Sequence, residues 1–158
     1  MAKNLKTIIL AAGKGTRMKS DLPKVLHAIA GKPLLQFVLD NVKALGLKEI
    51  SAVVGFRKDL VMAYLDKNDK KIKTIEQKRL LGTADALKSV LGKLKGFKGH
   101  LLVLYGDNPL IEKNSLENLI KRHTSSGADC TMLTATVDNP FGYGRIIRDN
   151  YSRIRRIS

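Results

Sequence analysis

Two patterns of hydrophobic positions alternate along most of this chain. Short apolar or alternating runs are typical of strands, and they occur at residues 7–10, 49–55, 71–75 and 100–105. Between these runs apolar residues recur at a spacing of three or four, which predicts amphipathic helices at residues 34–45, 58–65, 84–94 and 114–126. Because strands and helices follow one another in turn, we expect an α/β fold with a mostly parallel sheet in a three-layer sandwich.

Some patterns predict finer features of these elements. The run at residues 100–105 is almost entirely apolar, as expected for a central strand that is covered on both faces. Thr83 precedes a helical pattern and is placed to cap that helix. Asn114 and Glu117 have the spacing of a capping box at the start of the last predicted helix.

The carboxyl-terminal part of the chain is expected to be mainly extended. Residues 128–137 are predicted to form another strand, with Cys130 as a small core residue rather than a nucleophile. Residues 145–148 and 153–157 alternate between polar and apolar types, with a turn-like Asp-Asn pair between them. This arrangement predicts a β-hairpin.

Composition limits the class of protein. The chain has 158 residues, enough for one domain with a substantial core. No apolar run approaches the roughly 20 residues that span a bilayer, so we expect no membrane insertion and a cytoplasmic protein. The single cysteine excludes an internal disulfide framework.

The net charge of +15 is unusually high and predicts attraction to polyanions at low salt. The basic residues are spread along the chain, and aromatic residues make up only 5% and are not interleaved with them. A stacking platform for single-stranded nucleic acid is therefore poorly supported, and no specific nucleic-acid partner is expected. A lysine-rich solvated surface accounts for most of this charge.

The stretch that follows the first predicted strand has the composition of a phosphate-binding loop. Gly13 and Gly15 allow a tight turn, and Lys14, Arg17 and Lys24 supply positive charge. The spacing is not that of a Walker A loop, and Met18 stands where a dinucleotide fingerprint needs its third glycine. The loop is thus predicted to bind phosphate, but it matches neither of these two common motifs.

Two other segments carry candidate chemistry. Gln77 lies five residues before Gly82 and Thr83, which by themselves indicate no more than the start of a helix. Asp107 follows the apolar run at residues 100–105, at a position where open α/β sheets bind ligands. The sequence around Asp107 alone leaves two interpretations open. Asp107 is either a turn residue or a ligand of a Mg²⁺ ion that bridges to phosphates.

The motif Gly-x-Gly-Thr-Arg-Met at residues 13–18, followed by Leu-Pro-Lys at residues 22–24, resembles the signature of the sugar-nucleotide pyrophosphorylases. These nucleotidyltransferases join a nucleoside triphosphate to a sugar phosphate. Within this superfamily, residues 10–18 and 20–27 are most similar to the bacterial N-acetylglucosamine-1-phosphate uridylyltransferases. The resemblance covers almost the whole chain and implies a Rossmann-like, GT-A-like nucleotidyltransferase domain over residues 1–158.

The resemblance also implies a role for individual residues. Arg17 and Lys24 would be catalytic, because they would neutralise the triphosphate and the reacting phosphates. Tyr105, Gly106 and Gly144 would contact the sugar, and Asp107 would hold Mg²⁺. The residues implied in nucleotide binding are Leu10, Ala11, Ala12, Gly13, Gly15, Thr16, Arg17, Lys24, Gln77, Gly82 and Thr83, of which the last three would recognise uracil.

The implied reaction is attack by the phosphate oxygen of N-acetylglucosamine-1-phosphate on the α-phosphorus of UTP, which yields UDP-N-acetylglucosamine and pyrophosphate. No general base is required because the nucleophile is already ionised, which agrees with the lack of a catalytic dyad in the sequence. Catalysis would depend on positioning and on charge neutralisation by the protein and Mg²⁺.

Members of this family continue beyond the point that corresponds to residue 158. Their later residues contact the sugar and complete the Mg²⁺ site, and a hexapeptide-repeat β-helix acetylates glucosamine-1-phosphate and forms trimers. We therefore expect a carboxyl-terminally incomplete domain that is monomeric without the trimerising part. Three alternatives stay open: another base or sugar, a fragment that binds UTP without turnover, and a nucleic-acid-binding protein.

Overall fold

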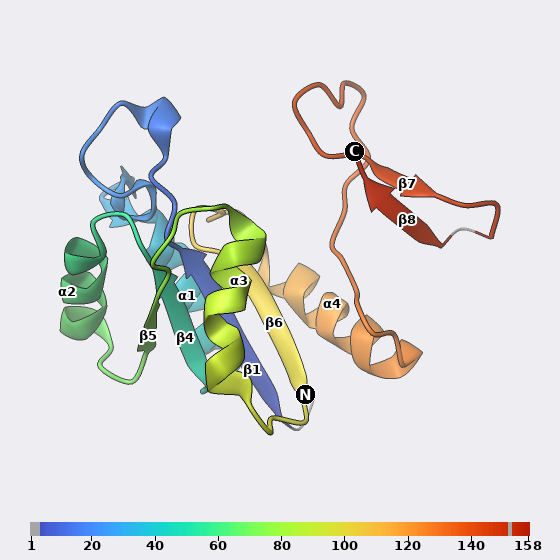
Figure 1. The fold of residues 1–158 in the computed structure, drawn as a ribbon, viewed down its shortest axis with the longest axis horizontal. Coiled ribbons are helices and arrows are strands. Elements are labelled where there is room, and N and C mark those ends of the chain that lie inside the picture. Colours follow the sequence, from blue (N-terminus) through green and yellow to red (C-terminus); the bar gives the residue numbers. More distant parts are fainter. Residues whose placement is uncertain (1–3, 152) are drawn as a thin grey trace.

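A computed structural model describes residues 4–151 and 153–158. Its centre is a parallel four-stranded sheet in the order β5-β4-β1-β6 (Figure 1). Ladders pair β1 with β4 on one side and with β6 on the other, and Leu10 is opposite Tyr105 at the carboxyl ends. The strands are β1 (Leu5–Ala11), β4 (Ile50–Val54), β5 (Lys73–Glu76) and β6 (His100–Tyr105).

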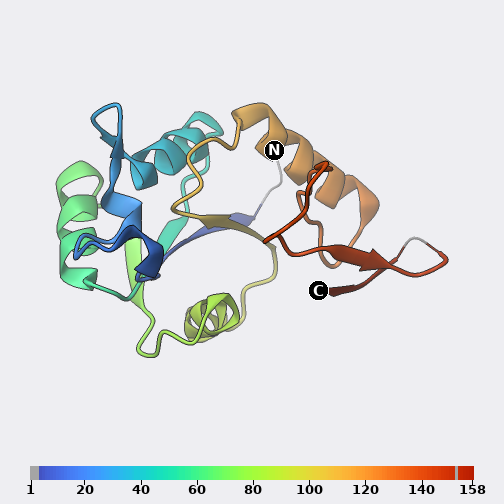
Figure 2. The ribbon, with the colours of Figure 1, turned by 90° about the horizontal axis from the view of Figure 1, so that it is seen from above.

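Helices cover both faces of this sheet, so the three-layer arrangement predicted from the sequence is confirmed. Viewed from above, α1, α2 and α4 lie on one side of the sheet, and α3 lies alone on the other side (Figure 2). Their bounds are α1 (Leu34–Ala44), α2 (Lys58–Asn68), α3 (Thr83–Leu91) and α4 (Lys113–Ser126). All four occupy segments with the expected helical spacing.

The alternation of side chains along β1 divides the core into two parts. Ile9 and Ala11 belong to the larger hydrophobic cluster, which includes the buried faces of α1, α2 and α4. Ile8 and Leu10 belong to a smaller cluster beneath α3. Successive strand residues point to opposite faces, so β1 anchors both layers and fixes the position of the loop that follows it.

Short elements connect these layers, and all but the last lie at the carboxyl end of the sheet. The loop after β1 contains a single turn of 3-10 helix, η1 (Thr16–Met18), and a second such turn, η2 (Lys24–Leu26), follows it. A small antiparallel ladder of β2 (Ala28–Ile29) and β3 (Lys32–Pro33) leads into α1. A third turn, η3 (Gly92–Leu94), extends α3.

The prediction that residues 100–105 form a central strand is wrong. This segment is β6, but it is at one edge of the sheet, and within the described part of the chain only β1 pairs with it. Leu101 is 41% exposed and Tyr105 is 49% exposed. An almost entirely apolar sequence indicates a strand, but it does not reveal whether a further strand covers the outer edge.

Residues 128–137 do not form the predicted strand. They run as an irregular, mostly exposed segment after α4, and Cys130 is exposed rather than packed in a core. The start of the segment is held to the end of α4 by a hydrogen bond between Nδ1 of His123 and the hydroxyl of Thr131, at 2.9 Å, and by one from the N–H of Ala128 to the hydroxyl of Ser126, at 3.4 Å. A strand needs a neighbour for its backbone groups, and no described strand pairs with these residues.

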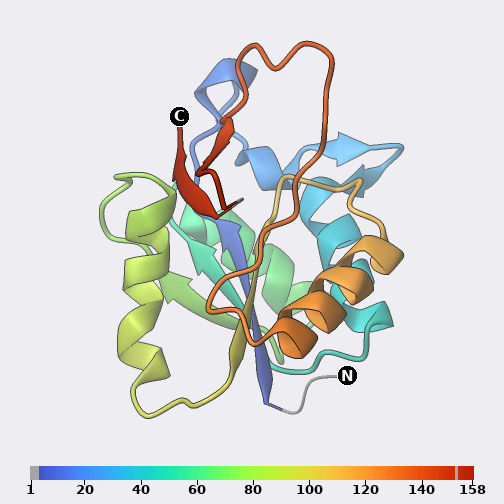
Figure 3. The ribbon, with the colours of Figure 1, turned by 90° about the vertical axis from the view of Figure 1, so that its right-hand side faces the viewer.

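The predicted hairpin is confirmed as β7 (Ile146–Arg148) paired in an antiparallel manner with β8 (Ile154–Ile157). It forms a separate two-stranded sheet that stands away from the parallel sheet (Figure 1). In the side view, the segment after α4 runs past the sheet toward the end at which the blue loop after β1 lies (Figure 3).

Both predictions of side-chain helix caps are wrong. The residue that caps α3 is Gly82, with φ of 99°, and Thr83 is the first residue inside the helix. The residue that caps α4 is Glu112, and Asn114 lies within the first turn. Neither helix has a side-chain hydrogen bond at its cap, because each helix begins one or more residues earlier than the cap signals suggested.

Candidate functional site

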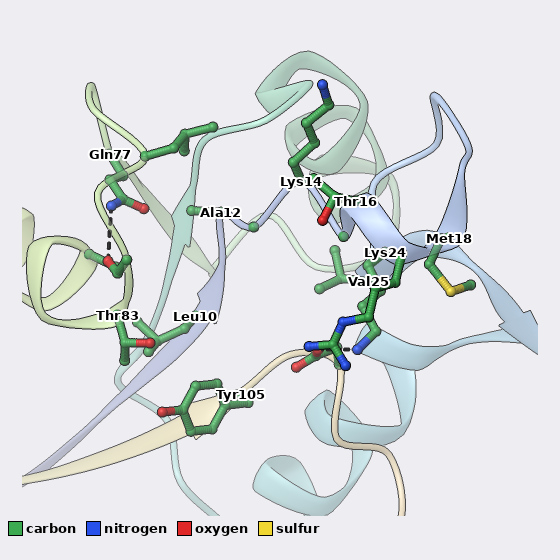
Figure 4. A pocket seen from close by; sticks show the side chains of 17 residues that line it. Leu10, Ala12, Lys14, Thr16, Met18, Lys24, Val25, Gln77, Thr83 and Tyr105 are labelled. Carbon is green, nitrogen blue, oxygen red and sulfur yellow. Dashed lines mark hydrogen bonds and ion pairs between the residues drawn. The ribbon is translucent and has the colours of Figure 1, made fainter. Parts of the chain in front are cut away.

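A cavity of about 610 Å³ lies at the carboxyl ends of β1 and β6, between the loop after β1 and the start of α3 (Figure 4). Ligands of open α/β sheets bind in such a place. The lining residues are Leu10, Ala12, Gly13, Lys14, Gly15, Thr16, Arg17, Met18, Lys24, Val25, Gln77, Leu80, Gly82, Thr83, Ala86, Tyr105 and Asp107.

Most residues that the sequence singled out therefore meet at one cavity, although they come from segments up to about a hundred residues apart. Three do not line it. Ala11 is buried in the larger core cluster, and Gly106 is buried directly after the end of β6. Gly144 lies on the carboxyl-terminal hairpin, where a Cβ atom would be 2.9 Å from Ile157.

The loop after β1 requires glycine at one position in particular. Gly15 has φ of 61°, in the left-handed region that L-residues rarely adopt. A Cβ atom on Gly15 would lie 2.7 Å from the Cβ of Lys24, closer than van der Waals contact permits. The bare backbone of Gly15 therefore allows η1 and η2 to approach each other, which brings Lys24 to the cavity.

Lys24 forms an ion pair with Asp107 across the cavity. Its Nζ donates a hydrogen bond of 2.7 Å to Oδ2 of the carboxylate, and both side chains are between 30% and 40% exposed. Lys14 and Arg17 also line the cavity, and no described carboxylate forms an ion pair with either. Three cations and one carboxylate thus line the cavity, so it favours an anionic ligand.

Of the residues that the structure describes, Asp107 is the only acidic one that lines the cavity. Among the described residues, no group of three or more His, Cys, Asp or Glu side chains could enclose a metal ion. This donor set fits Mg²⁺, which is commonly held by one or two carboxylates together with substrate phosphates and water. The carboxylate could contribute one ligand, and a metal ion there would compete with the ammonium of Lys24.

At the other end of the cavity, the side chain of Gln77 is 5% exposed. Its backbone N–H donates to the carbonyl of Val54 at 2.8 Å, just beyond the ladder between β4 and β5. Its side-chain Nε2 donates to the carbonyl of Gly82 at 3.2 Å and to Oδ2 of Asp85 at 2.8 Å. The amide is therefore held rigidly at the wall of the cavity.

The sugar residues that the resemblance implied are only partly brought together. Tyr105 lines the cavity and is half-exposed. Gly106 donates its N–H to the carbonyl of Leu10 at 2.9 Å, and a Cβ atom there would be 3.1 Å from the same oxygen. Gly106 thus lets the chain turn closely over β1 before Asp107.

The apolar wall of the cavity and the partner of Gln77 were not predicted from the sequence. Val25, Leu80 and Ala86 line the cavity, but nothing in their sequence context distinguishes them from ordinary core residues. Asp85 contacts Gln77 from the first turn of α3. An acidic residue in a first helical turn is so common that its spacing from Gln77 carries no signal.

Comparison with known proteins identifies the family to which the chain belongs. The family profile described as "MobA-like NTP transferase domain" matches residues 7–156. The chain belongs to this family, and its fold is that of a nucleotidyltransferase domain. No described helix is long and apolar enough to cross a membrane.

Among individual relatives, the chain is similar to two proteins named "Bifunctional protein GlmU". It is 46% identical to the protein from Trichlorobacter lovleyi over 95% of this chain and 32% of that protein. It is 45% identical to the protein from Pelotomaculum thermopropionicum over 98% of this chain and 33% of that protein. The chain thus spans about a third of the length of these curated relatives.

Solved structures with the same fold are more distant in sequence. HddC from Yersinia pseudotuberculosis, complexed with GMP-PN, aligns with a TM-score of 0.69 at 23% identity over 96% of this chain and 68% of its own. Rv0371c from Mycobacterium tuberculosis, in complex with manganese, aligns with a TM-score of 0.63 at 18% identity over 78% of this chain and 61% of its own. These likenesses show the fold.

Proposed function

We propose that this chain binds UTP in the cavity at the carboxyl end of the sheet and transfers its uridylyl group to a sugar 1-phosphate. The proposed acceptor is N-acetylglucosamine-1-phosphate, and the products are UDP-N-acetylglucosamine and pyrophosphate. The observation that carries this proposal is the convergence in one cavity of a cationic glycine loop, a rigid amide and a single carboxylate. The resemblance of residues 13–18 and 22–24 to the sugar-nucleotide pyrophosphorylase signature supports the choice of a sugar phosphate as acceptor.

In this proposal, different cationic groups of the cavity contact different phosphates of the triphosphate. The backbone of the loop from Gly13 to Thr16 and the side chain of Arg17 neutralise the phosphates, since N–H groups and guanidinium bind phosphate oxygens strongly. Lys24 stands at the boundary between this loop and Asp107, where it stabilises charge that develops around the reacting phosphate. Preorganised cations of this kind act without reorientation during the reaction.

The chemical step is a single displacement at phosphorus. An oxygen of the sugar phosphate forms a bond to the α-phosphorus, and the bond from that phosphorus to the pyrophosphate oxygen breaks with its electron pair. The attacking oxygen is ionised at neutral pH, so the protein must orient the two reactants and shield their charges rather than remove a proton. A Mg²⁺ ion held by Asp107 would supply further positive charge to the phosphate oxygens.

Pyrophosphate release from UTP and N-acetylglucosamine-1-phosphate in the presence of Mg²⁺ tests this proposal. In wild-type protein we expect release, and Asp107→Asn should reduce its rate about 10²–10³-fold, since the variant removes one preorganised charge contact. Asp59→Asn is the matched control, because Asp59 lies exposed in the first turn of α2 and does not line the cavity. Equal rates in wild type and Asp107→Asn would exclude Asp107 from the reaction.

A second function, nucleotide binding without turnover, is favoured by the position of Gly144 outside the cavity. In that case UTP would bind to the wild-type chain with no release of pyrophosphate at any acceptor concentration. The two functions are distinguished by a UTP titration carried out on the same protein preparation as the release assay.

A further inference from the structure

The side-chain amide of Gln77 is fixed in one of its two possible orientations. Its nitrogen lies 3.2 Å from the carbonyl oxygen of Gly82 and 2.8 Å from a carboxylate oxygen of Asp85. Both partners accept hydrogen bonds and neither can donate one at these atoms. The reverse orientation would place the amide oxygen against two other oxygens, so the nitrogen must face α3.

The oxygen of the same amide is consequently available to a ligand. No residue that the structure describes donates a hydrogen bond to Oε1 of Gln77. Gln77 lines the cavity, and in the close-up view its oxygen points to the side on which Ala12 lies, while its nitrogen points along the dashed line to Gly82 (Figure 4). At this point the cavity therefore presents an acceptor.

An acceptor at this place distinguishes pyrimidine bases. Uracil and thymine carry an N–H donor at ring position 3, whereas cytosine carries a lone pair there. The oxygen of Gln77 could accept the N–H of uracil but would repel the lone pair of cytosine. A site that is built to satisfy a particular hydrogen bond discriminates strongly against a ligand that leaves its buried polar group unpaired.

The geometry points to Asp85 as a positioning residue that makes the cavity select a base with an N–H donor at ring position 3. This inference rests on the proposed function, because it assumes that the cavity binds a nucleotide with its base near Gln77. Asp85 acts only through Gln77, and the comparisons assign it no role. A carboxylate suits this task because, when ionised, it can only accept hydrogen bonds and thus permits only one orientation of the amide.

Substitution of Asp85 by asparagine tests whether Asp85 orients the amide of Gln77 or only supports the local structure. The asparagine amide can donate as well as accept, so the Asp85→Asn variant satisfies either orientation of Gln77 and leaves only the carbonyl of Gly82 to favour one. We expect the ratio of the dissociation constants for CTP and UTP to fall about tenfold, as for the loss of one hydrogen bond to a charged group. A loss of structural support alone would weaken binding of both nucleotides and leave this ratio unchanged.

The experiment measures binding of UTP and CTP by calorimetry to wild type, Asp85→Asn and the control Asp59→Asn. Asp59, like Asp85, lies in the first turn of a helix, so the control makes the same chemical change away from the cavity. A ratio that falls in Asp85→Asn and not in Asp59→Asn supports the inference. If Asp85→Asn does not fold, as judged by circular dichroism, Asp85→Ala takes its place with the same expected direction.

Three results would overturn the inference. Wild-type protein that prefers UTP while both Asp85 variants keep the same ratio would remove Asp85 from specificity but leave the proposed function intact. Equal binding of UTP and CTP by wild-type protein would show that the cavity does not select a base with an N–H donor at ring position 3. Wild-type protein that binds no nucleoside triphosphate would instead contradict the proposed function, and this inference with it.

Discussion

Replacement of Gly15 by alanine tests whether the close approach of η1 and η2 creates the nucleotide site. The added Cβ atom would lie 2.7 Å from the Cβ of Lys24, which is close to the backbone and cannot swing away. Either η1 or η2 must therefore move by several tenths of an ångström. In addition, φ of 61° is unfavourable for alanine by about 1–2 kcal/mol.

Displacement of the loop should weaken UTP binding substantially. Each charge-assisted hydrogen bond that is lost costs about 1.5–3 kcal/mol, so the loss of one or two contacts from Lys24 or the loop amides should raise the dissociation constant for UTP at least tenfold. Calorimetric titration with UTP and Mg²⁺ measures this change, and thermal unfolding measures the accompanying loss of stability.

Gly46→Ala is a matched control for this experiment. Gly46 has φ of 68°, almost the same as Gly15, but a Cβ atom there would meet nothing within 4 Å. Both variants should lose a similar amount of stability from backbone strain, whereas only Gly15→Ala should lose affinity for UTP. Gly15→Ala protein that binds UTP as tightly as Gly46→Ala would refute the argument that this contact positions the site.

Two further predictions concern stability. The hydroxyl of Thr7 is fully buried and has no hydrogen-bond partner among the described residues, so Thr7→Val should raise the free energy of unfolding by about 1 kcal/mol in urea titrations, and an unchanged or lower value would contradict this. The hydrogen bond from Lys43 lowers the pKa of Asp69 below its ordinary value of 3.8, so the pair stabilises the fold above about pH 4 and ceases to do so as the pH falls through the lowered pKa. Lys43→Met should therefore be less stable than wild type by up to about 1 kcal/mol at neutral pH, and equally stable once the pH lies below the lowered pKa of Asp69. Urea unfolding at a series of acidic pH values measures this, and a difference that persists throughout would rule out the ion pair as its cause.

The sequence allowed the parallel sheet and its helices to be predicted because their patterns are local. A run such as residues 100–105 is apolar whether it pairs on one side or on two, so its position at the edge of the sheet could not be predicted. The strand expected at residues 128–137 failed for a related reason. Its sequence favours extended backbone, but strand formation depends on a partner that lies far along the chain.

Residues of the candidate site were easiest to predict from the sequence where the backbone conformation requires a particular residue type. Gly15 is such a case, because its left-handed conformation and its contact with Lys24 both exclude a side chain. The contact of Asp85 with Gln77 could not be predicted, since it depends on how the chain between β5 and α3 folds back. Gly144 matched a motif, yet its hairpin lies apart from the cavity.

The central claim, that the cavity is a uridine nucleotide site, is tested most directly by titrating wild-type protein and Arg17→Ala with UTP, CTP, GTP and ATP in the presence of Mg²⁺. We expect wild-type protein to bind UTP with one-to-one stoichiometry and to prefer it over the other three nucleotides. Arg17→Ala should bind UTP at least tenfold more weakly, because one charge-assisted phosphate contact is lost. Wild-type protein that shows no preference for UTP, or an Arg17→Ala variant that binds it equally well, would contradict this account.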